Sequence, residues 1–198
     1  MKNVVSDRAG RTLAERHEAY AAEIRALLDA ALAVMRTEQT IDPRVSDIVR
    51  TAGLSNQVFY RHFKGKDELL LALLEDGRER LTATVERRMQ RASTDAGRVR
   101  SWVEAVLAQA RDANAADTTR PFVANADRLT AAYPDEVRLS RSRLVGPLAA
   151  LVGEVAADAV YHLATGSAHD AITERRAPTA REVDQLVQFS LRGCGLGD

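Results

Sequence analysis

The sequence has one cysteine, Cys194, so it cannot form an intramolecular disulfide, and its cysteine usage does not indicate a secreted scaffold. It also lacks an uninterrupted apolar stretch of about 20 residues, the length that a membrane-spanning helix requires. The N-terminal segment MKNVVSDRAGR has no apolar core of the kind found in secretion signals. We therefore expect a cytoplasmic protein that makes no membrane contact.

Catalytic and metal-binding signatures are missing as well. The chain has no P-loop, no dinucleotide fingerprint and no G-x-S-x-G motif. The four histidines do not pair with one another or with the cysteine at the spacing of metal ligands. Asp158 and His162 lie four residues apart, which an ordinary pair on a helix surface explains. The sequence therefore predicts neither an enzyme nor a protein with a metal or other cofactor.

The composition favours helices. Hydrophobic residues make up 45% of the 198 positions, which is enough for a packed core. No series of β-rich stretches separated by turn signals is present, and Ala, Leu, Arg and Glu dominate. The 28 basic and 28 acidic residues give a formal net charge of +0. We expect an all-α protein in which any strongly charged surface is local.

The most informative stretch, residues 42–74, has the pattern of two short helices, a tight turn between them and the start of a long helix. Asp42 and Pro43 suit the N-cap and the first position of the first short helix. Gly53 suits its exit, because glycine adopts a positive φ without steric cost. Ser55 is the expected N-cap of the second helix, whose apolar side comprises Val58, Phe59 and Phe63.

The other sides of this second helix are polar, and they carry amide, phenol, imidazole and guanidinium groups, which read base edges and bind phosphates. Residues 44–66 contain five basic residues and one acidic residue, a local charge of 5 − 1 = +4. In a neutral chain, such a patch indicates a contact with a polyanion. The alternative is an ordinary helical hairpin with a solvated basic face.

The segment AGLSNQVFYRHFKGKDELLLALLED resembles the DNA-binding domain of the tetracycline-repressor (TetR) family of bacterial transcription regulators. The similarity rests on the Ala-Gly-Leu-Ser turn at 52–55, the aromatic-Tyr-x-His-Phe run at 59–63 and Lys-Asp-Glu-Leu-Leu at 66–70. It implies an N-terminal three-helix helix-turn-helix domain at 12–65 and a helical ligand-binding and dimerisation domain at 66–198, about nine helices in all. The helix at 66–92 would link the two.

The resemblance also implies roles for single residues in DNA binding. Contacts to bases or sugars in the major groove are expected from Asn56, Gln57 and Tyr60. Phosphate contacts are expected from Arg44, Ser55, His62 and Lys66. The sequence departs from the family pattern at Pro43 and at Arg44, where threonine is more usual, so the contact at Arg44 is not transferred directly.

Periodicity and punctuation predict the remaining elements. Residues 1–11 are expected to be a polar arm in which Arg8 and Arg11 are additional candidates for phosphate contacts, and Thr12 is expected to cap the first helix. Loops are predicted at 93–97 and 114–119, and Tyr133-Pro134 should end a short helix at 122–129. A helix at 137–155 should be kinked at Gly146-Pro147, and the boundary between it and the helix at 156–176 is not evident. A capping box of Thr179 and Glu182 begins the last helix.

The second domain is expected to bind a small-molecule effector and to form a homodimer through its last two helices. The candidate ligand contacts are the larger aromatic and polar residues Trp102, Phe122, Asn125, Arg128, Tyr133 and His162. For each of them, plain core packing or a surface position is the alternative. Small residues at Ala164, Ser167, Ala168 and Ala171 suit a close dimer interface, unless they pack inside their own subunit.

Together these features predict a sequence-specific transcriptional regulator of palindromic double-stranded DNA, in the first place a repressor released by its effector. Ligand binding would tilt the helix at 66–92 and change the spacing of the two recognition helices. The alternative is an all-helical small-molecule-binding or adaptor protein whose helix-turn-helix contacts another protein.

Overall fold

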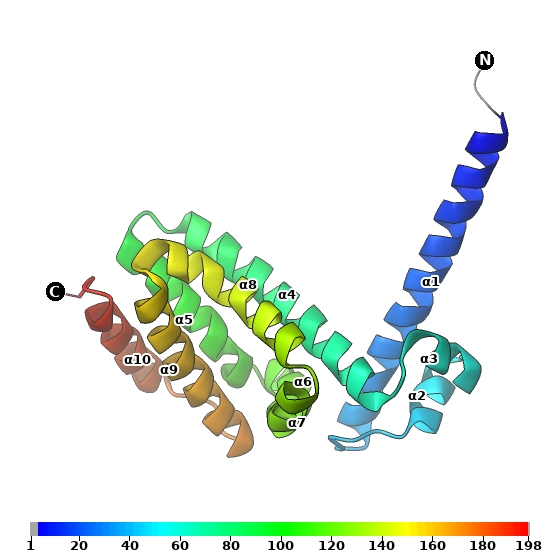
Figure 1. The fold of residues 1–198 in the computed structure, drawn as a ribbon. Helices are drawn as coiled ribbons and strands as arrows, with labels where there is room; N and C mark the ends of the chain where they lie inside the picture. Colours follow the sequence, from blue (N-terminus) through cyan, green and yellow to red (C-terminus); the bar gives the residue numbers. More distant parts are fainter. Residues whose placement is uncertain (1–3, 198) are drawn as a thin grey trace. The chain divides into compact units, whose positions relative to one another are not determined.

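The computed structural model describes residues 4–197, with side chains from residue 13 onward, and within this range it contains ten α-helices and no strand. In chain order (Figure 1) they are α1 (Val4–Thr37), α2 (Val45–Ala52), α3 (Asn56–His62), α4 (Lys66–Arg91), α5 (Asp95–Arg111), α6 (Ala113–Ala124), α7 (Ala126–Ala132), α8 (Pro134–Val152), α9 (Glu154–Thr173) and α10 (Ala180–Gly193). The all-α class is confirmed, with one helix more than the expected nine. None of the described helices combines the length and apolar character of a membrane span.

The chain divides into two compact units, residues 1–69 and residues 70–198. Helices α1, α2 and α3 lie in the first unit, and α5 to α10 lie in the second. Helix α4 begins in the first unit with Lys66 and continues in the second, as the uninterrupted pattern of residues 66–92 predicts.

The first helix is longer than expected. It begins at Val4, whereas the capping-box spacing of Thr12 and Glu15 predicts a start at Thr12. The expected arm at residues 1–11 is therefore helical from Val4 onward. No proline or cap interrupts this segment, so the helix propagates through it. The side chains of Arg8 and Arg11 lie outside the described part of the chain.

The helix-turn-helix forms where the sequence predicts it, with one correction at its start. The N-cap of α2 is Arg44 and not Asp42, and its side chain makes no capping hydrogen bond. Gly53 ends α2 in the left-handed conformation, with φ 66° and ψ 27°. The Ser55 hydroxyl caps α3 by accepting a hydrogen bond from the amide of Val58 at 3.3 Å. These two residues set the direction in which α3 leaves the turn.

The first unit has a small apolar core. Helix α1 packs against α2 and α3 and contributes a buried stripe, and its partners contribute fully or almost fully buried side chains from both short helices. The main buried residues are Leu27, Leu28, Ala31, Val34, Met35, Ile48, Val49, Phe59 and Phe63. Because α3 has only seven residues, this packing must supply the rigidity that so short a helix lacks alone.

The second unit is organised around α5, which packs against α6, α8, α9 and α10. In Figure 1, α5, α9 and α10 run side by side. The inward face of α5 is almost entirely buried and includes Val99, Trp102, Val103, Val106 and Leu107. This face forms one continuous core with residues of α4, α8, α9 and α10.

Three predictions in this unit are wrong or incomplete. The expected loop at 114–119 belongs to helix α6, because Asp112 caps it by accepting a hydrogen bond from the amide of Ala115 at 2.8 Å. The open boundary between the helices near residue 153 lies at Gly153, whose φ of 83° ends α8. Val155, expected on the inward side of the earlier helix, belongs to α9 and is 88% exposed.

Candidate nucleic-acid interface

Helix α3 separates a buried side from a polar exposed side. Phe59 is fully buried, whereas Asn56, Gln57 and Tyr60 are exposed, Tyr60 by 60% of its surface. The Tyr60 ring meets the Phe59 ring edge-on at a centroid distance of 5.2 Å, which restrains its orientation. Two amides and a phenol therefore project from one short, anchored helix, the groups that can form hydrogen bonds with base edges and sugars.

Two expected phosphate-binding residues flank these groups. Ser55 is exposed, and its oxygen accepts the capping hydrogen bond from Val58, so the hydroxyl hydrogen remains able to donate. Arg44 is exposed at the N-cap of α2 and makes no ion pair with any residue that the structure describes. Both side chains can donate hydrogen bonds to an anion without breaking an existing ion pair.

Lys66 is also accessible but already has a partner. Its Nζ lies 2.7 Å from Oδ1 of Asp42, and its side chain is 35% exposed. An exposed ion pair of this kind contributes only about 0–1 kcal/mol, so a phosphate can replace the carboxylate at little cost. Asp42, which the sequence predicts as an N-cap, instead neutralises Lys66 in the free protein.

His62 does not occupy the position that the sequence indicates. Its side chain is fully buried, and Nε2 lies 2.6 Å from Oε2 of Glu23 on α1. The ring meets Tyr20 edge-on at 4.2 Å, and Nδ1 is buried without a hydrogen-bond partner. A ring enclosed in this way cannot reach a phosphate, so we remove His62 from the expected contacts.

Glu23 binds the neighbouring residue too. Nη2 of Arg61 donates hydrogen bonds to both carboxylate oxygens of Glu23, at 2.8 and 2.7 Å. Hydrogen bonds from His62 and then from Arg61 hold the pKa of Glu23 below its ordinary value, so the carboxylate is ionised at neutral pH. An ionised carboxylate only accepts, which assigns the proton of the shared bond to Nε2 of His62. Sequence reasoning missed Glu23, because it lies 38 residues before Arg61 and no local motif connects them.

These contacts reduce the basic patch that the sequence predicts. Of its five basic residues, Arg50 pairs with Asp47, Arg61 with Glu23 and Lys66 with Asp42. Within the described residues, Arg44 and Lys64 make no ion pair. The available positive charge is therefore smaller than +4, and it lies at the start of α2, on Arg44, and just after the end of α3, on Lys64.

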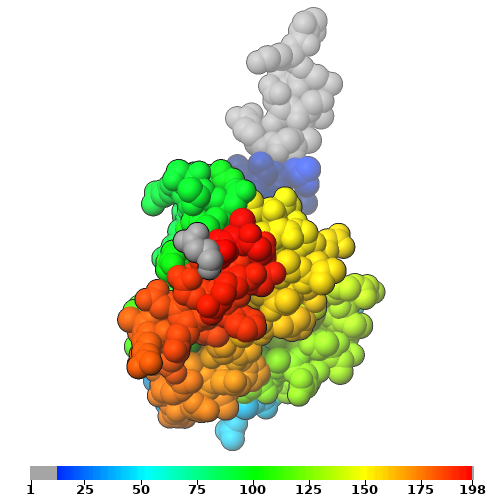
Figure 2. Space-filling view, turned by 90° about the vertical axis from the view of Figure 1, so that its left-hand side faces the viewer, coloured from blue at the N-terminus to red at the C-terminus, as the bar shows by residue number. Residues whose placement is uncertain are grey.

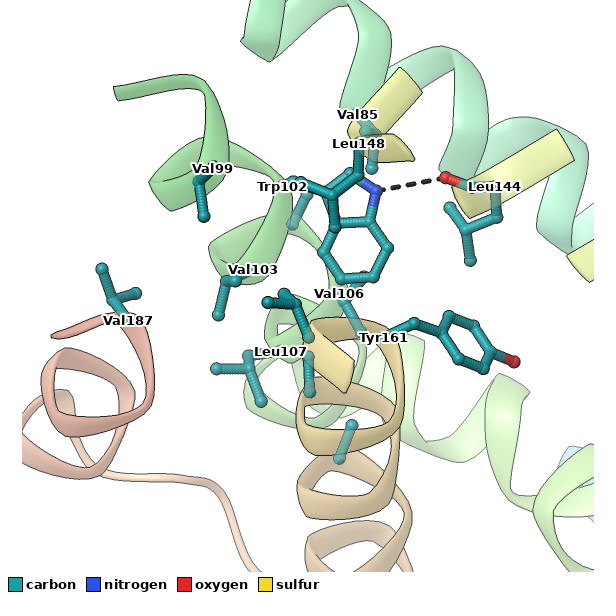
Figure 3. Close-up of a cluster of buried hydrophobic side chains, with 14 of the residues drawn as sticks. Val85, Val99, Trp102, Val103, Val106, Leu107, Leu144, Leu148, Tyr161 and Val187 are labelled. Carbon is teal, nitrogen blue, oxygen red and sulfur yellow. Dashed lines mark hydrogen bonds between the residues drawn. The ribbon is translucent and has the colours of Figure 1, made fainter. Parts of the chain in front are cut away.

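In the second unit, the most conspicuous ligand candidate is a core residue. Trp102 is fully buried, and its indole N–H donates a hydrogen bond to the carbonyl of Leu144 at 3.1 Å (Figure 3). Figure 3 shows the ring surrounded by aliphatic side chains from several helices, among them Val85 and Leu148. The indole has its polar partner and its apolar surroundings within the protein, so packing explains it.

The other five candidates are distributed over several environments. Phe122 and Tyr133 are half-buried, and Asn125 is buried with its side-chain amide donating to the carbonyl of Pro121 at 2.7 Å. Arg128 is exposed on α7. His162 is exposed on α9, where its Nε2 lies 3.0 Å from Nη2 of Arg141. The six candidates thus differ widely in burial, from the fully buried Trp102 to the exposed Arg128 and His162.

Arg78 is a further candidate that the sequence does not single out. It lies on α4, and its one hydrogen bond among the described residues goes to the carbonyl of Val137 at 3.2 Å. Burial lowers its pKa from the ordinary value. A partly buried guanidinium without a carboxylate partner is able to bind an anionic group. Its surroundings on other helices distinguish it from the many surface arginines, and no sequence signal gives that information.

Helices α9 and α10 present a broad surface, the α9–α10 face. In Figure 2 the end of α9 (orange) and α10 (red) lie side by side on the side turned to the viewer. A shallow groove of about 410 Å³ on this face is lined in part by Leu163, Ser167, Leu186 and Phe189, the last of which is 63% exposed. By contrast, three of the four small residues expected at a dimer interface, Ala164, Ala168 and Ala171, are buried within the single chain, as the alternative held.

Comparison with known proteins connects this geometry to a family. Residues 27–73, which include all of α2 and α3, match the family described as bacterial regulatory proteins, tetR family. A curated relative, the HTH-type transcriptional regulator BetI of Rhizobium meliloti (strain 1021), is 33% identical over 79 residues. The match covers 40% of this chain and only 39% of BetI.

Solved structures extend the similarity of fold to most of the chain. A protein of Mesorhizobium loti MAFF303099 described as a TetR-family transcriptional regulator superposes with a TM-score of 0.66 at 19% identity, over 87% of this chain and 96% of that one. The regulator FadR of Bacillus subtilis, solved in complex with stearoyl-CoA, gives 0.62 at 17% identity, over 87% and 96%. Residues 27–73 are thus similar to the bacterial tetR family of regulatory proteins, and most of the chain has the fold of these solved structures.

Proposed function

We propose that the protein is a sequence-specific DNA-binding transcriptional regulator, a repressor that acts in the cytoplasm and releases DNA when it binds a small-molecule effector. The observation that carries the proposal is the division of α3 into an anchored apolar side and an exposed polar side. Three hydrogen-bonding side chains are exposed on the first two turns of this helix, while its other side is anchored in the core. BetI, which is 33% identical over 79 residues, is itself named an HTH-type transcriptional regulator.

The proposed contacts follow from exposure. Asn56, Gln57 and Tyr60 would face base edges and sugars in the major groove. Arg44, Ser55 and Lys66 would bind phosphates on the two sides of the groove, Lys66 after exchanging Asp42 for phosphate. His62 is no longer included, because its ring is enclosed between α1 and α3.

One copy of α3 contacts few base pairs, so we propose that two chains bind a palindrome as a homodimer. The α9–α10 face is the proposed interface. Its exposed Phe189 and the apolar part of the groove beside it, which includes Leu163 and Leu186, would be buried by a second copy of the same face. A two-fold axis through such a self-complementary face places two α3 helices in related positions.

The effector would bind to the second unit. FadR of Bacillus subtilis, which has a similar fold, was solved in complex with stearoyl-CoA. The candidates that retain accessible surface are Phe122, Arg128, Tyr133 and His162, to which Arg78 is added. An effector that binds one conformation of this unit better than another shifts the population toward it. Since α4 continues from the first unit into the second, such a shift would change the spacing of the two α3 helices. A coupling of about 1–3 kcal/mol would suffice to change operator occupancy appreciably.

A selection experiment tests the proposal. The purified protein is incubated with a pool of random duplexes, and bound DNA is amplified and sequenced over several rounds. We expect enrichment of a palindrome whose half-sites are about one helical turn apart. A helix-turn-helix that serves only protein contacts would enrich no sequence, and that result would refute the proposal.

A further inference from the structure

Glu23 connects α1 to two successive residues at the end of α3 by three hydrogen bonds. Two come from Nη2 of Arg61, and the third comes from Nε2 of His62 at 2.6 Å. We propose that Glu23 is a positioning and specificity-determining residue of DNA binding: it fixes the end of α3 and withholds Arg61 from phosphates. This inference rests on the proposed function, and it adds a residue that would touch no DNA.

The positioning part follows from the environment of His62. The ring is fully buried, and among the described residues Glu23 provides its one hydrogen bond. A buried polar group that loses its partner is costly, so without Glu23 the end of α3 is expected to move until the ring is solvated. Because α3 has only seven residues, a shift at its end also displaces Tyr60, which directly precedes Arg61, and Gln57 near its start.

The withholding part follows from Arg61. Its side chain is 53% exposed on the helix that carries the base-reading groups, so it is near enough to the surface to bind a phosphate if it were released. Both oxygens of Glu23 accept from one guanidinium nitrogen, Nη2, and the same carboxylate also accepts from the buried ring of His62, so it is more constrained than Asp42 beside Lys66. Phosphate contacts carry no sequence information, so a released Arg61 would raise affinity for every duplex alike.

These two effects predict opposite changes in the affinities for operator and for unrelated DNA when Glu23 is removed. Removing an acidic residue near a DNA-binding surface ordinarily strengthens binding to all DNA, since the carboxylate repels phosphates. Removing Glu23 is instead expected to weaken binding to the operator while it strengthens binding to unrelated DNA. A surface carboxylate without a positioning role would not separate the two affinities.

The test uses E23A, which removes the carboxylate that both residues bind, and E18A as the matched control. Glu18 is exposed on the same helix and makes no ion pair within the described residues, so its loss removes the same charge alone. Fluorescence anisotropy gives the dissociation constants for the selected palindrome and for a scrambled duplex of equal length. For E23A we expect about tenfold weaker operator binding and tighter scrambled binding, whereas E18A should shift both affinities equally.

A second variant, R61Q, keeps the inference testable if E23A folds poorly, which circular dichroism would detect. An arginine that contacts phosphate contributes about one unit to the slope of log affinity against log salt. Since Glu23 occupies Arg61, we expect R61Q to leave this slope unchanged. A reduced slope in R61Q, or equal discrimination by E23A and E18A, would overturn the inference alone. A wild-type protein without preference for any duplex would instead refute the proposed function and this inference together.

Discussion

The two units of the chain use their conspicuous side chains in opposite ways. In the first unit, the polar residues Asn56, Gln57 and Tyr60 that stand out in the sequence are exposed on α3. In the second unit, the residue that stands out most, Trp102, is fully buried with its indole N–H satisfied by Leu144. Residues that stand out in the sequence as large or polar are therefore exposed in the first unit, whereas the most prominent one in the second unit is part of the core.

The cause of this difference is the range of the interactions. A short helix between a glycine turn and a serine cap exposes its polar side for local reasons, because residues three or four apart share a face. The environment of Trp102 depends on α8, whose residues lie about forty positions away in the chain. Local patterns therefore predict the exposed polar side of α3, whereas a ligand pocket depends on contacts between distant helices.

The largest expected effect tests the core assignment of Trp102. W102A should lower the free energy of unfolding by about 3–5 kcal/mol, because a large buried ring is replaced by a cavity. W102F retains most of the apolar volume and loses the hydrogen bond to Leu144, at a cost of about 1–2 kcal/mol. Urea denaturation followed by circular dichroism measures both. If W102F were as stable as the wild type but failed to bind an effector, Trp102 would be a ligand contact and the contrast would disappear.

The next effect tests the α9–α10 face. F189R places a charge in the proposed dimer interface and should raise the dimer dissociation constant at least about 30-fold, the effect expected of a central interface residue. The matched control is L139R, which alters an apolar residue on α8 that is 53% exposed. Sedimentation velocity measures both. Equal dimerisation of the two variants would place the interface elsewhere.

A pair of substitutions separates the roles within the first unit. Q57A should alter the preferred bases and cost about 1–3 kcal/mol of operator affinity, because it removes an amide that we propose reads the bases. K66A should weaken binding to all duplexes without altering the preference, and by less, because Lys66 must first leave Asp42. Repeating the selection experiment with each variant checks this. Two identical sequence preferences would contradict the assigned roles.

The smallest expected effect concerns the stability of the fold at acidic pH. Hydrogen bonds from Thr179 and the charge of Arg176 hold the pKa of Glu182 below its ordinary value of 4.5 in the folded protein. A carboxyl with a lowered folded-state pKa stabilises the fold above about pH 4.5, and this stability is lost as the pH falls through the folded value. E182Q should therefore reduce the melting temperature at pH 7 and flatten its decline in acid. An unchanged acid dependence would show that the capping box contributes little to stability.

Much of the fold was predictable because it depends on local signals. Gly53 in the left-handed conformation, Ser55 as a cap and the capping box of Thr179 and Glu182 are all confirmed. Each of these signals acts within four residues of the chain. The failures at 114–119 and at Val155 arose where helix-compatible segments follow one another without strong punctuation, so their boundaries depend on packing and single caps.

The site was predictable only in part for a related reason. The exposure of Gln57 follows from helix periodicity, whereas the burial of His62 depends on Tyr20 and Glu23 of another helix. Among the residues of the same motif, the sequence gives no means of separating one that faces solvent from one held by a distant carboxylate. The contacts of Glu23 therefore emerge only when α1 and α3 are packed together.

The most direct test of the central claim is the salt dependence of affinity for the selected palindrome. If Arg44 and Lys66 of both copies bind phosphates, four cations displace counterions, and the slope of log affinity against log salt should be about −3.6. A scrambled duplex should bind more weakly at every salt concentration. A slope near zero, or equal affinity for the two duplexes, would contradict the claim that the exposed side of α3 is a DNA-reading surface.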